Sequence, residues 1–306
     1  MLEILTKALS LVAVVGLALL LKRIGWASIK DFPLISRLVL TITLPCALLT
    51  SFNDYDLDAA LLGLAVIGLS ATVGQQLIGL LLARRNGRKA QAFAVINSGS
   101  FNIGAFGMPY LSGFMGPQAI VYAALFDIGN AIGAAGVGYG WGMALARERT
   151  TKTRWSETLR VLGSSPVLIT YVALLLMRLL DLRLPDPVIG FTGLVGAANP
   201  FLAMLMIGIG LELKLDRSKY LAAARHLLVR YCFCTLAALA CWTLLPYSAE
   251  IRLVLVLVLF APLASMIAGF TGRAGLDVEL SSFITSVSLV VGVVAMPTLF
   301  LLLQSS

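Results

Sequence analysis

Hydrophobic runs of about 20 residues, separated by short polar segments, recur along nearly the whole chain. An α-helix of about this length crosses the hydrocarbon core of a bilayer. The pattern predicts an all-α polytopic membrane protein with ten transmembrane helices, at residues 4–22, 33–52, 59–83, 91–113, 117–145, 164–181, 188–211, 224–245, 251–271 and 280–303. The first run could be a signal peptide, but Glu3 weakens its basic start and no A-x-A-like cleavage site follows. We interpret it as the first span.

The longest polar connection divides the ten spans into two sets of five. It covers residues 147–163, which we predict to lie in the cytoplasm, and it separates residues 1–146 from residues 164–306. Each set is expected to be one structural repeat. Because five is an odd number, the second repeat must cross the membrane in the opposite sense to the first.

Prolines at matching places support the repeat. Pro45 and Pro200 lie in the second span of each set, and Pro109 and Pro262 lie in the fourth. A proline inside a helix removes a backbone donor and crowds the preceding turn, so the helix kinks or breaks. We therefore predict helix breaks at all four prolines. Interrupted helices at corresponding places in two inverted repeats indicate the binding site of a secondary transporter.

The fourth span is the strongest candidate for that site, because its middle is polar. Asn97, Ser98, Ser100 and Asn102 precede Pro109. Backbone freed at membrane depth is tolerated only against other protein or a water-filled cavity. Half-helix N-termini present unpaired N–H groups and the positive end of the helix dipole, which together can hold an anion. We expect a small organic anion to bind at the midplane.

The charged residues predict the orientation. Only 12% of the residues are charged, and the mean hydropathy is +0.95. Eighteen Lys and Arg residues follow the odd-numbered spans, and four lie on the other side. The positive-inside rule then puts both termini on the non-cytoplasmic side. The net charge of +8 resides in these short loops, so no nucleic-acid partner is predicted.

Three segments resemble the auxin efflux carrier family, which includes plant auxin carriers and bacterial malate or malonate permeases. The segment FNIGAFGMPYL is similar to the family's Asn-x-x-x-x-Gly-x-Pro-x-Leu signature, whose positions are filled by Asn102, Gly107, Pro109 and Leu111. The second span, ISRLVLTITLPCALLTSFN, resembles the family's second helix. The last two spans, APLASMIAGFTGRAGLDVELSSFITSVSLVVGVVAMP, follow its closing pattern.

The resemblance implies a scaffold of spans 1, 2, 6 and 7 and a transport domain of spans 3–5 and 8–10. It also implies elevator-type alternating access, with a mono- or dicarboxylate at the crossing of spans 4 and 9 and Asn102 in the substrate site. The chain lacks the long hydrophilic loop of many plant carriers. This places it with compact bacterial members in a bacterial cytoplasmic (inner) membrane, with the lipid bilayer and a homodimer partner at the scaffold as expected contacts.

The predicted substrate-binding residues share a place at or beside the helix breaks; they are Asn102, Ser98, Asn97, Gly107, Pro109, Pro262, Ser265, Asn199 and Pro45. The prolines would shape the breaks and touch a ligand only through backbone. For the polar residues the alternative is interhelical hydrogen bonding, which is common in membrane proteins. Thr285, Ser286 and Ser288 are interpreted as packing residues.

Asp127 is the one carboxylate deep within a predicted span, with Asn130 one turn further along. A buried unpaired charge is costly, so Asp127 must be protonated, paired or close to water. Two interpretations stay open. Asp127 and Asn130 form a coupling site for a proton or a sodium ion, or Asp127 is a neutral carboxyl bonded to a neighbouring helix. For Arg230 we favour a side chain that extends to the membrane interface over one that contacts substrate.

Other classes of function fit less well. No metal or other cofactor is predicted: the chain has one histidine, His226, and its four cysteines lie in apolar runs, where buried inert thiols are the better interpretation. An intramembrane enzyme would need a second carboxylate or a metal-binding helix. A channel would favour rings of like residues. The alternative within transporters is a cation-coupled antiporter or a bile-acid-type sodium symporter on a similar fold.

Overall fold

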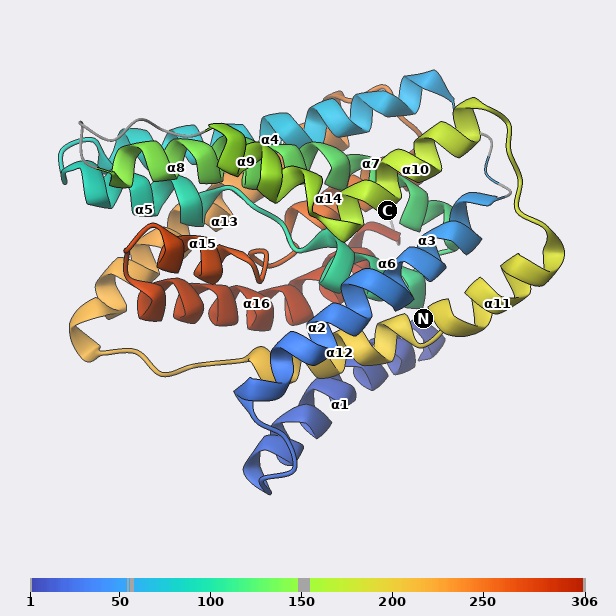
Figure 1. Ribbon diagram of the computed structural model, residues 1–306, viewed down its shortest axis with the longest axis horizontal. Helices are drawn as coiled ribbons and strands as arrows, with labels where there is room; N and C mark the ends of the chain where they lie inside the picture. The colour runs from blue at the N-terminus through green and yellow to red at the C-terminus, as the bar shows by residue number, and fades with distance from the viewer. Residues whose placement is uncertain (1, 54, 56–57, 148–154, 305–306) are drawn as a thin grey trace.

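A computed structural model describes residues 2–53, 55, 58–147 and 155–304. The described residues form helices joined by short connections, and none of them lies in a strand. The long helices run roughly along the horizontal axis of Figure 1, and the bundle around α4 to α10 is crossed obliquely by a second layer that contains α1 and α12.

The helices of the first predicted repeat follow the hydrophobic runs. The α-helices are α1 (Leu2–Arg23), α2 (Phe32–Leu38), α3 (Leu44–Asn53), α4 (Gly63–Ala83), α5 (Arg88–Ser98), α6 (Met108–Phe114), α7 (Pro117–Ala131) and α8 (Tyr139–Ala146). Three π-helical segments join some of them without a gap: η2 (Val39–Thr43), η4 (Ile103–Gly107) and η5 (Ile132–Gly138). Short 3₁₀ turns, η1 (Ile29–Asp31) and η3 (Ala59–Leu62), precede α2 and α4.

The second predicted repeat begins after a short helix, α9 (Trp155–Gly163). Its helices are α10 (Pro166–Leu179), α11 (Asp186–Gly196), α12 (Asn199–Gly210), α13 (Tyr220–Leu244), α14 (Ala249–Leu259), α15 (Ile267–Arg273) and α16 (Val278–Gln304), with a 3₁₀ turn, η6 (Arg217–Lys219), before α13.

Six of these helices or joined helices are long and apolar enough to cross a membrane: Ile29–Asn53, Ala60–Ala83, Pro117–Ala146, Asp186–Gly210, Arg217–Leu244 and Val278–Gln304. They match six of the ten predicted spans. The other four predicted spans correspond to α1, to α5 with η4 and α6, to α10, and to α14 with α15. The protein is therefore a helical multi-pass membrane protein, and the count of ten crossings stays a prediction.

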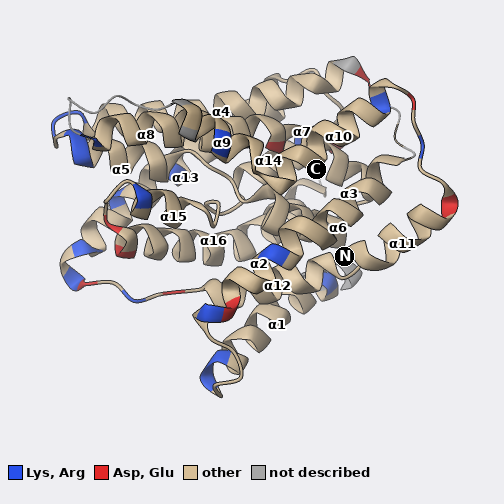
Figure 2. Ribbon diagram, viewed as in Figure 1, with Lys and Arg blue, Asp and Glu red and all other residues tan. Residues whose placement is uncertain are grey.

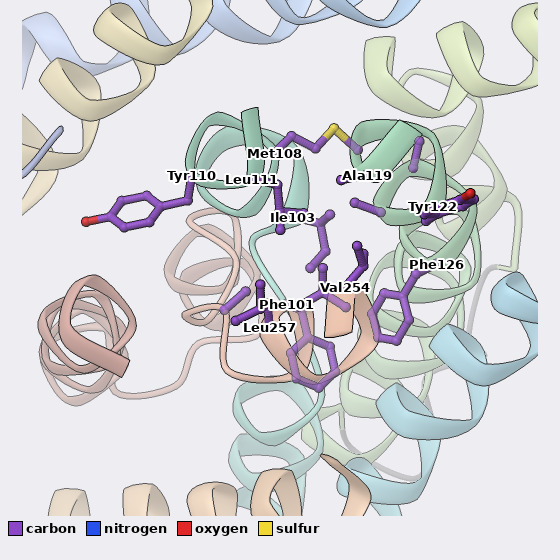
Figure 3. Packing of buried hydrophobic residues seen from close by; sticks show 14 of the residues in the cluster. Phe101, Ile103, Met108, Tyr110, Leu111, Ala119, Tyr122, Phe126, Val254 and Leu257 are labelled. Atoms are coloured by element: carbon purple, nitrogen blue, oxygen red, sulfur yellow. The ribbon is translucent and has the colours of Figure 1, made fainter. Parts of the chain in front are cut away.

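The helices pack in two groups. In one group α1 packs along α12, α3 along α11, and α2 against α12. In the other, α4 packs along α7 and α5, and α14 contacts α7, α13 and α16. Between α6, α7 and α14 lies an apolar core that includes Phe101, Leu111, Phe126 and Leu257, all nearly fully buried (Figure 3). Helix α10 contacts α3 of the first group and α7 of the second.

Two helices of the second group are interrupted. The first stops at Ser98 and resumes at Ile103, and the second stops at Leu259 and resumes at Ile267. Each interruption follows a helix of eleven residues, and α6 and α15 each have seven. The two interrupting segments contact each other: the Asn102 N–H donates to the Pro262 carbonyl (2.7 Å), and the Ala264 N–H donates to Ser100 Oγ (3.3 Å).

Two of the four predicted breaks are at the wrong place. Pro262 lies inside an interruption, and Pro200 is the second residue of α12, which begins directly after the short turn at residues 197–198. Pro109, however, is the second residue of α6, and Pro45 is the second residue of α3. In both cases a π-helical segment runs directly into the proline's helix. The wider turn accommodates the proline without ending the helix.

Glycine and serine cause the first interruption instead. A Cβ on Gly99 would lie 2.1 Å from the carbonyl oxygen of Thr72, so only glycine allows this segment to approach α4 so closely. Ser100 Oγ bonds to backbone across the interruption rather than within its own helix. The break therefore falls about ten residues before Pro109.

The cysteines are all free, but they are not all buried as predicted. Cys234 and Cys241 are buried and Cys46 is partly buried, whereas Cys232 is exposed on the outer face of α13. Leu228 and Leu236, one turn away on either side, are exposed on the same face of α13, so no other helix covers this face at Cys232.

Candidate functional site

A cavity of about 350 Å³ opens beside the two interruptions. One wall consists of Phe101 and Asn102 with the first turn of η4, and residues 264–266 of the second interruption lie next to it. The opposite wall comes from α2, α9, α10 and α12, through residues such as Ser36, Pro166 and Met206. The cavity thus lies between the two groups of helices.

Two predicted binding residues meet in this cavity. Asn102 Nδ2 donates to Ser265 Oγ at 3.2 Å, so each interruption contributes one polar side chain to the same place. Asn102 is 6% exposed and Ser265 is partly exposed. The first turn of η4 also lines the cavity, and the N–H groups of a first helical turn lack intrahelical partners. An amide, a hydroxyl and backbone N–H groups are donors suited to an oxyanion.

Asp127 and Asn130 line the same cavity from α7. The Asn130 amide donates to Asp127 Oδ1 (2.7 Å) and to the Phe101 carbonyl (2.7 Å), and its oxygen accepts from the Phe101 N–H (3.0 Å) and from Thr72 Oγ1 (3.1 Å). Asn130 therefore holds the backbone next to Asn102 in place. Asp127 and Asn130 are hydrogen-bonded neighbours and line the same cavity as Asn102. Both interpretations of Asp127, a coupling site and a carboxyl bonded to a neighbouring helix, stay open.

A tyrosine absent from the predicted site completes this cluster. Tyr171 lies on α10 and is 1% exposed, and its hydroxyl donates to Asp127 Oδ2 at 2.7 Å. The bond links α7 of the second group to α10, which also packs against α3 of the first group. The only signal in the sequence was a phenol in the middle of an apolar run, where a buried hydroxyl needs a partner.

Several predicted residues lie elsewhere. Asn97 is fully buried away from the cavity and bonds to Thr271 and Ser281, which ties α5 to α15 and α16. Ser98 lies 3.3 Å from His226 Nε2 and lines a different cavity. Asn199 accepts a hydrogen bond from Thr43 (2.9 Å) and lines a third cavity, of about 180 Å³.

The remaining predicted residues act on backbone geometry. Pro262 supplies the carbonyl that receives the Asn102 N–H, and the Gly107 N–H closes a π-type bond to the Asn102 carbonyl (2.9 Å). Neither Pro109 nor Pro45 lines the cavity. Of the three packing residues, Ser288 accepts from the Leu263 N–H (2.9 Å) and Ser286 from the Glu212 N–H (2.9 Å).

The prediction for Arg230 was wrong. Its side chain does not extend to the interface but is 2% exposed beneath the interruptions. The guanidinium donates to the Ser98 carbonyl (3.1 Å), the Ala261 carbonyl (2.9 Å) and Gln75 Oε1 (3.1 Å). Ser98 ends α5 and Ala261 lies just after α14, so one cation serves the negative ends of both helices. Its Cζ is 4.9 Å from the centre of the Phe101 ring.

The fold and this cavity define a class: a helical multi-pass membrane protein with a polar site where two interrupted helices meet. Comparison with known families agrees with it. A family model described as membrane transport protein matches residues 3–158, just over half of the chain. The chain therefore belongs to this family, the auxin efflux carrier family. No curated protein matches the chain.

Proposed function

We propose that this membrane transport protein is a secondary carrier of small organic anions, either mono- or dicarboxylates, that binds its substrate beside Asn102 and Ser265. One observation carries the proposal. The two interrupted helices are hydrogen-bonded to each other at Asn102 and Pro262, and at this contact the cavity is lined by the uncharged donors of Asn102 and Ser265. Arg273, the last residue of α15, is the one cation among the described lining residues. Donors without a fixed charge can bind a carboxylate and still release it, as a carrier must.

The transport step is proposed to be an elevator movement. In this proposal α1, α2, α3 and α10 to α12 are the scaffold and the remaining long helices move. The position of the cavity, between the two groups of helices, is consistent with a site that one group carries past the other. The helices that precede the two interruptions have the same length, eleven residues each, which supports two inverted repeats. After the interruptions, α6 and α15 also have the same length, but η4 extends α6 at its start.

The cavity also suggests which side is open. Its lining includes Ser36 of α2, Ser165 at the start of α10 and Arg273 at the end of α15, which lie at or near helix ends whose adjoining connections the distribution of Lys and Arg assigns to the cytoplasm. In Figure 2 most basic residues gather at the left and lower ends of the view, around the ends of α1, α5 and α13. We infer an inward-open conformation in a bacterial cytoplasmic membrane.

Asp127 gives the carrier a means of proton coupling. A substrate carboxylate bound in this cavity would lie close to the Asp127 carboxyl, because Asp127 lines the cavity. Two negative charges repel strongly where the dielectric constant is low, so binding of the anion favours protonated Asp127. The substrate would then cross the membrane together with a proton. A sodium ion at Asp127 is the alternative coupling ion.

The test is a binding screen of the purified protein against mono- and dicarboxylic acids, by thermal shift. We expect at least one acid to raise the melting temperature, since a ligand at 100 times its Kd adds about 2.7 kcal/mol to stability. Asn102→Ala should lose this shift. Asn199→Ala removes an equivalent amide outside the cavity and should keep it. If no acid stabilises the protein, or if both variants respond like the wild type, the proposal is wrong.

A further inference from the structure

A second, larger cavity lies away from the candidate substrate site. It has a volume of about 700 Å³ and is bounded by α4, α5, α13 and the link between α15 and α16. It shares no lining residue with the cavity at Asn102. The proposed transport cycle does not use it.

The cavity forms because α4 and α13 are in contact at Gln75 and Arg230 and lie further apart one to two turns away from this contact. They meet where Gln75 Nε2 donates to the Arg230 carbonyl (3.3 Å) and contacts Cys234 Sγ (3.7 Å). Toward the ends of the helices that carry Arg84 and Arg225 the space opens, and Gly79 and His226 line its walls. Phe93 of α5 packs edge-on against the His226 ring, with centroids 5.5 Å apart, and closes the back.

The mouth of this cavity carries unpaired positive charge. Lys89 and Arg225 both line it and are exposed, and neither forms an ion pair with any carboxylate in the described part of the chain. Asp277 is the one described acidic residue in the lining, and it pairs with Lys219 Nζ at 2.9 Å, which Glu279 shares at 2.6 Å. Three cations, Lys89, Arg225 and Lys219, therefore face two carboxylates, which leaves one positive charge in excess. Partial burial opposes ionisation of Asp277, yet the Leu280 N–H and Lys219 outweigh it and hold its pKa below the ordinary value. The excess charge at the mouth is therefore positive.

The walls below the mouth are apolar. Leu82, Phe93, Val229 and Leu280 line them. The adjoining outer faces of α4 and α13 carry exposed Leu81, Leu221 and Leu228, as expected for surfaces that face lipid chains. A small hydrophilic anion would leave most of such a cavity without a favourable contact.

We propose that this cavity binds one anionic phospholipid, with its phosphate between Lys89 and Arg225 and part of an acyl chain against α4, α5 and α13. Basic pockets between transmembrane helices on the cytoplasmic side are suited to lipid head groups, because cations at the interface attract the phosphate while the chain stays in apolar surroundings. The innermost lining residue, Ser98, also supplies the carbonyl that Arg230 holds. The bound lipid would support the first interrupted helix from behind.

The experiment measures lipid binding to the purified full-length protein in neutral detergent, by native mass spectrometry and thermal shift. Phosphatidylglycerol should bind and stabilise the wild type, and phosphatidylcholine should bind much more weakly. Each Lys or Arg near an anionic head group contributes about 1 kcal/mol, so Lys89→Gln with Arg225→Gln should weaken binding of phosphatidylglycerol about thirtyfold. Arg84→Gln with Arg85→Gln removes the same charge from outside the cavity and should change it little.

Two further arms identify the source of the phosphate and test the apolar wall. Glycerol 3-phosphate should not compete with the lipid. Ala222→Trp keeps every charge and fills the cavity from an exposed position, so it should abolish binding without lowering the melting temperature of the lipid-free protein. Equal binding by the Lys89 and Arg225 variant and the wild type would overturn the proposal, as would full competition by glycerol 3-phosphate or unchanged binding in Ala222→Trp. Substrate binding is measured separately, so either proposal can fail alone.

Discussion

Asp127 lies where the cavity at Asn102 meets both groups of helices. It lies on α7, faces the cavity with Asn102, and receives a hydrogen bond from Tyr171 of α10. An ionised Asp127 accepts the Tyr171 hydroxyl more strongly than a protonated one, so the strength of this bond depends on the proton. One residue can thus link occupancy of the cavity to the contact between the groups.

We predict that Asp127→Asn removes the dependence of transport on the proton gradient. The amide keeps the size and the hydrogen bonds of the protonated acid but cannot release a proton. Uptake of an identified acid into proteoliposomes should respond at least tenfold less to an imposed pH gradient than uptake by the wild type. Asp186→Asn, at the start of α11 and outside the cavity, is the control. A response in Asp127→Asn equal to that of the wild type would remove Asp127 from coupling, and dependence on sodium instead would favour the alternative ion.

At the scale of single residues, the sequence predicted which polar residues line the cavity better than it predicted their hydrogen-bond partners. Asn102, Ser265, Asp127 and Asn130 were all predicted candidates, and the structure brings them together. The sequence could not distinguish Asn97 from these four residues. An asparagine that ties three helices together and one that lines a cavity both appear in the sequence as an amide within an apolar run. The partner of Asp127, Tyr171, is 44 residues away, and no local periodicity links the two.

The interrupted helices depend on a buried cation. Arg230 donates to backbone carbonyls at the ends of both α5 and the α14 segment, and these carbonyls have no next helical turn to bond with. The sequence could not reveal this role. Arg230 lies near the end of a predicted span, where a long cationic side chain usually reaches the interface. Arg230 stays buried because the second interruption places the Ala261 carbonyl within reach of its guanidinium, and this position cannot be read from the sequence.

We predict that Arg230→Gln destabilises the protein strongly. The change leaves buried carbonyls unsatisfied and removes the charge that opposes two helix dipoles, at a cost of about 3–5 kcal/mol. The melting temperature in detergent should fall by at least about 5 °C. Arg225→Gln, an exposed residue on the same helix, should stay within about 1 °C of the wild type. Similar melting temperatures for the two variants would contradict the role of Arg230.

The proline positions predicted two of the four helix breaks correctly. Pro262 and Pro200 lie at or beside real interruptions, whereas η4 and η2 carry the chain past Pro109 and Pro45 as widened turns. Whether a helix breaks or widens depends on what packs against it. At Gly99 the neighbour is the backbone of α4, which a single sequence does not reveal.

For the whole molecule, the hydropathy pattern predicted the class correctly. Six predicted spans match helices long and apolar enough to cross a membrane, and the family follows from the match over residues 3–158. The orientation stays a prediction, because it depends on loop charges alone. It also determines which compartment the cavity at Asn102 opens to.

Orientation can be measured by cysteine labelling in a variant whose four native cysteines are replaced by alanine. Asn86→Cys lies in the turn between α4 and α5, and Leu182→Cys lies in the connection between α10 and α11. In intact cells a membrane-impermeant maleimide should label Leu182→Cys and should reach Asn86→Cys only after the membrane is opened. The reverse pattern would mean that both termini are cytoplasmic and that the cavity opens outward.

The position of Arg230 behind Phe101 has a consequence for turnover. Phe101 lines the cavity, and the guanidinium lies 4.9 Å from its ring centre on the side of α13. An incoming carboxylate would feel a favourable potential without forming an ion pair, because the aromatic ring separates the two charges. Attraction of this kind speeds loading but adds little to the barrier for unloading, which suits a protein that must let go of its cargo in every cycle.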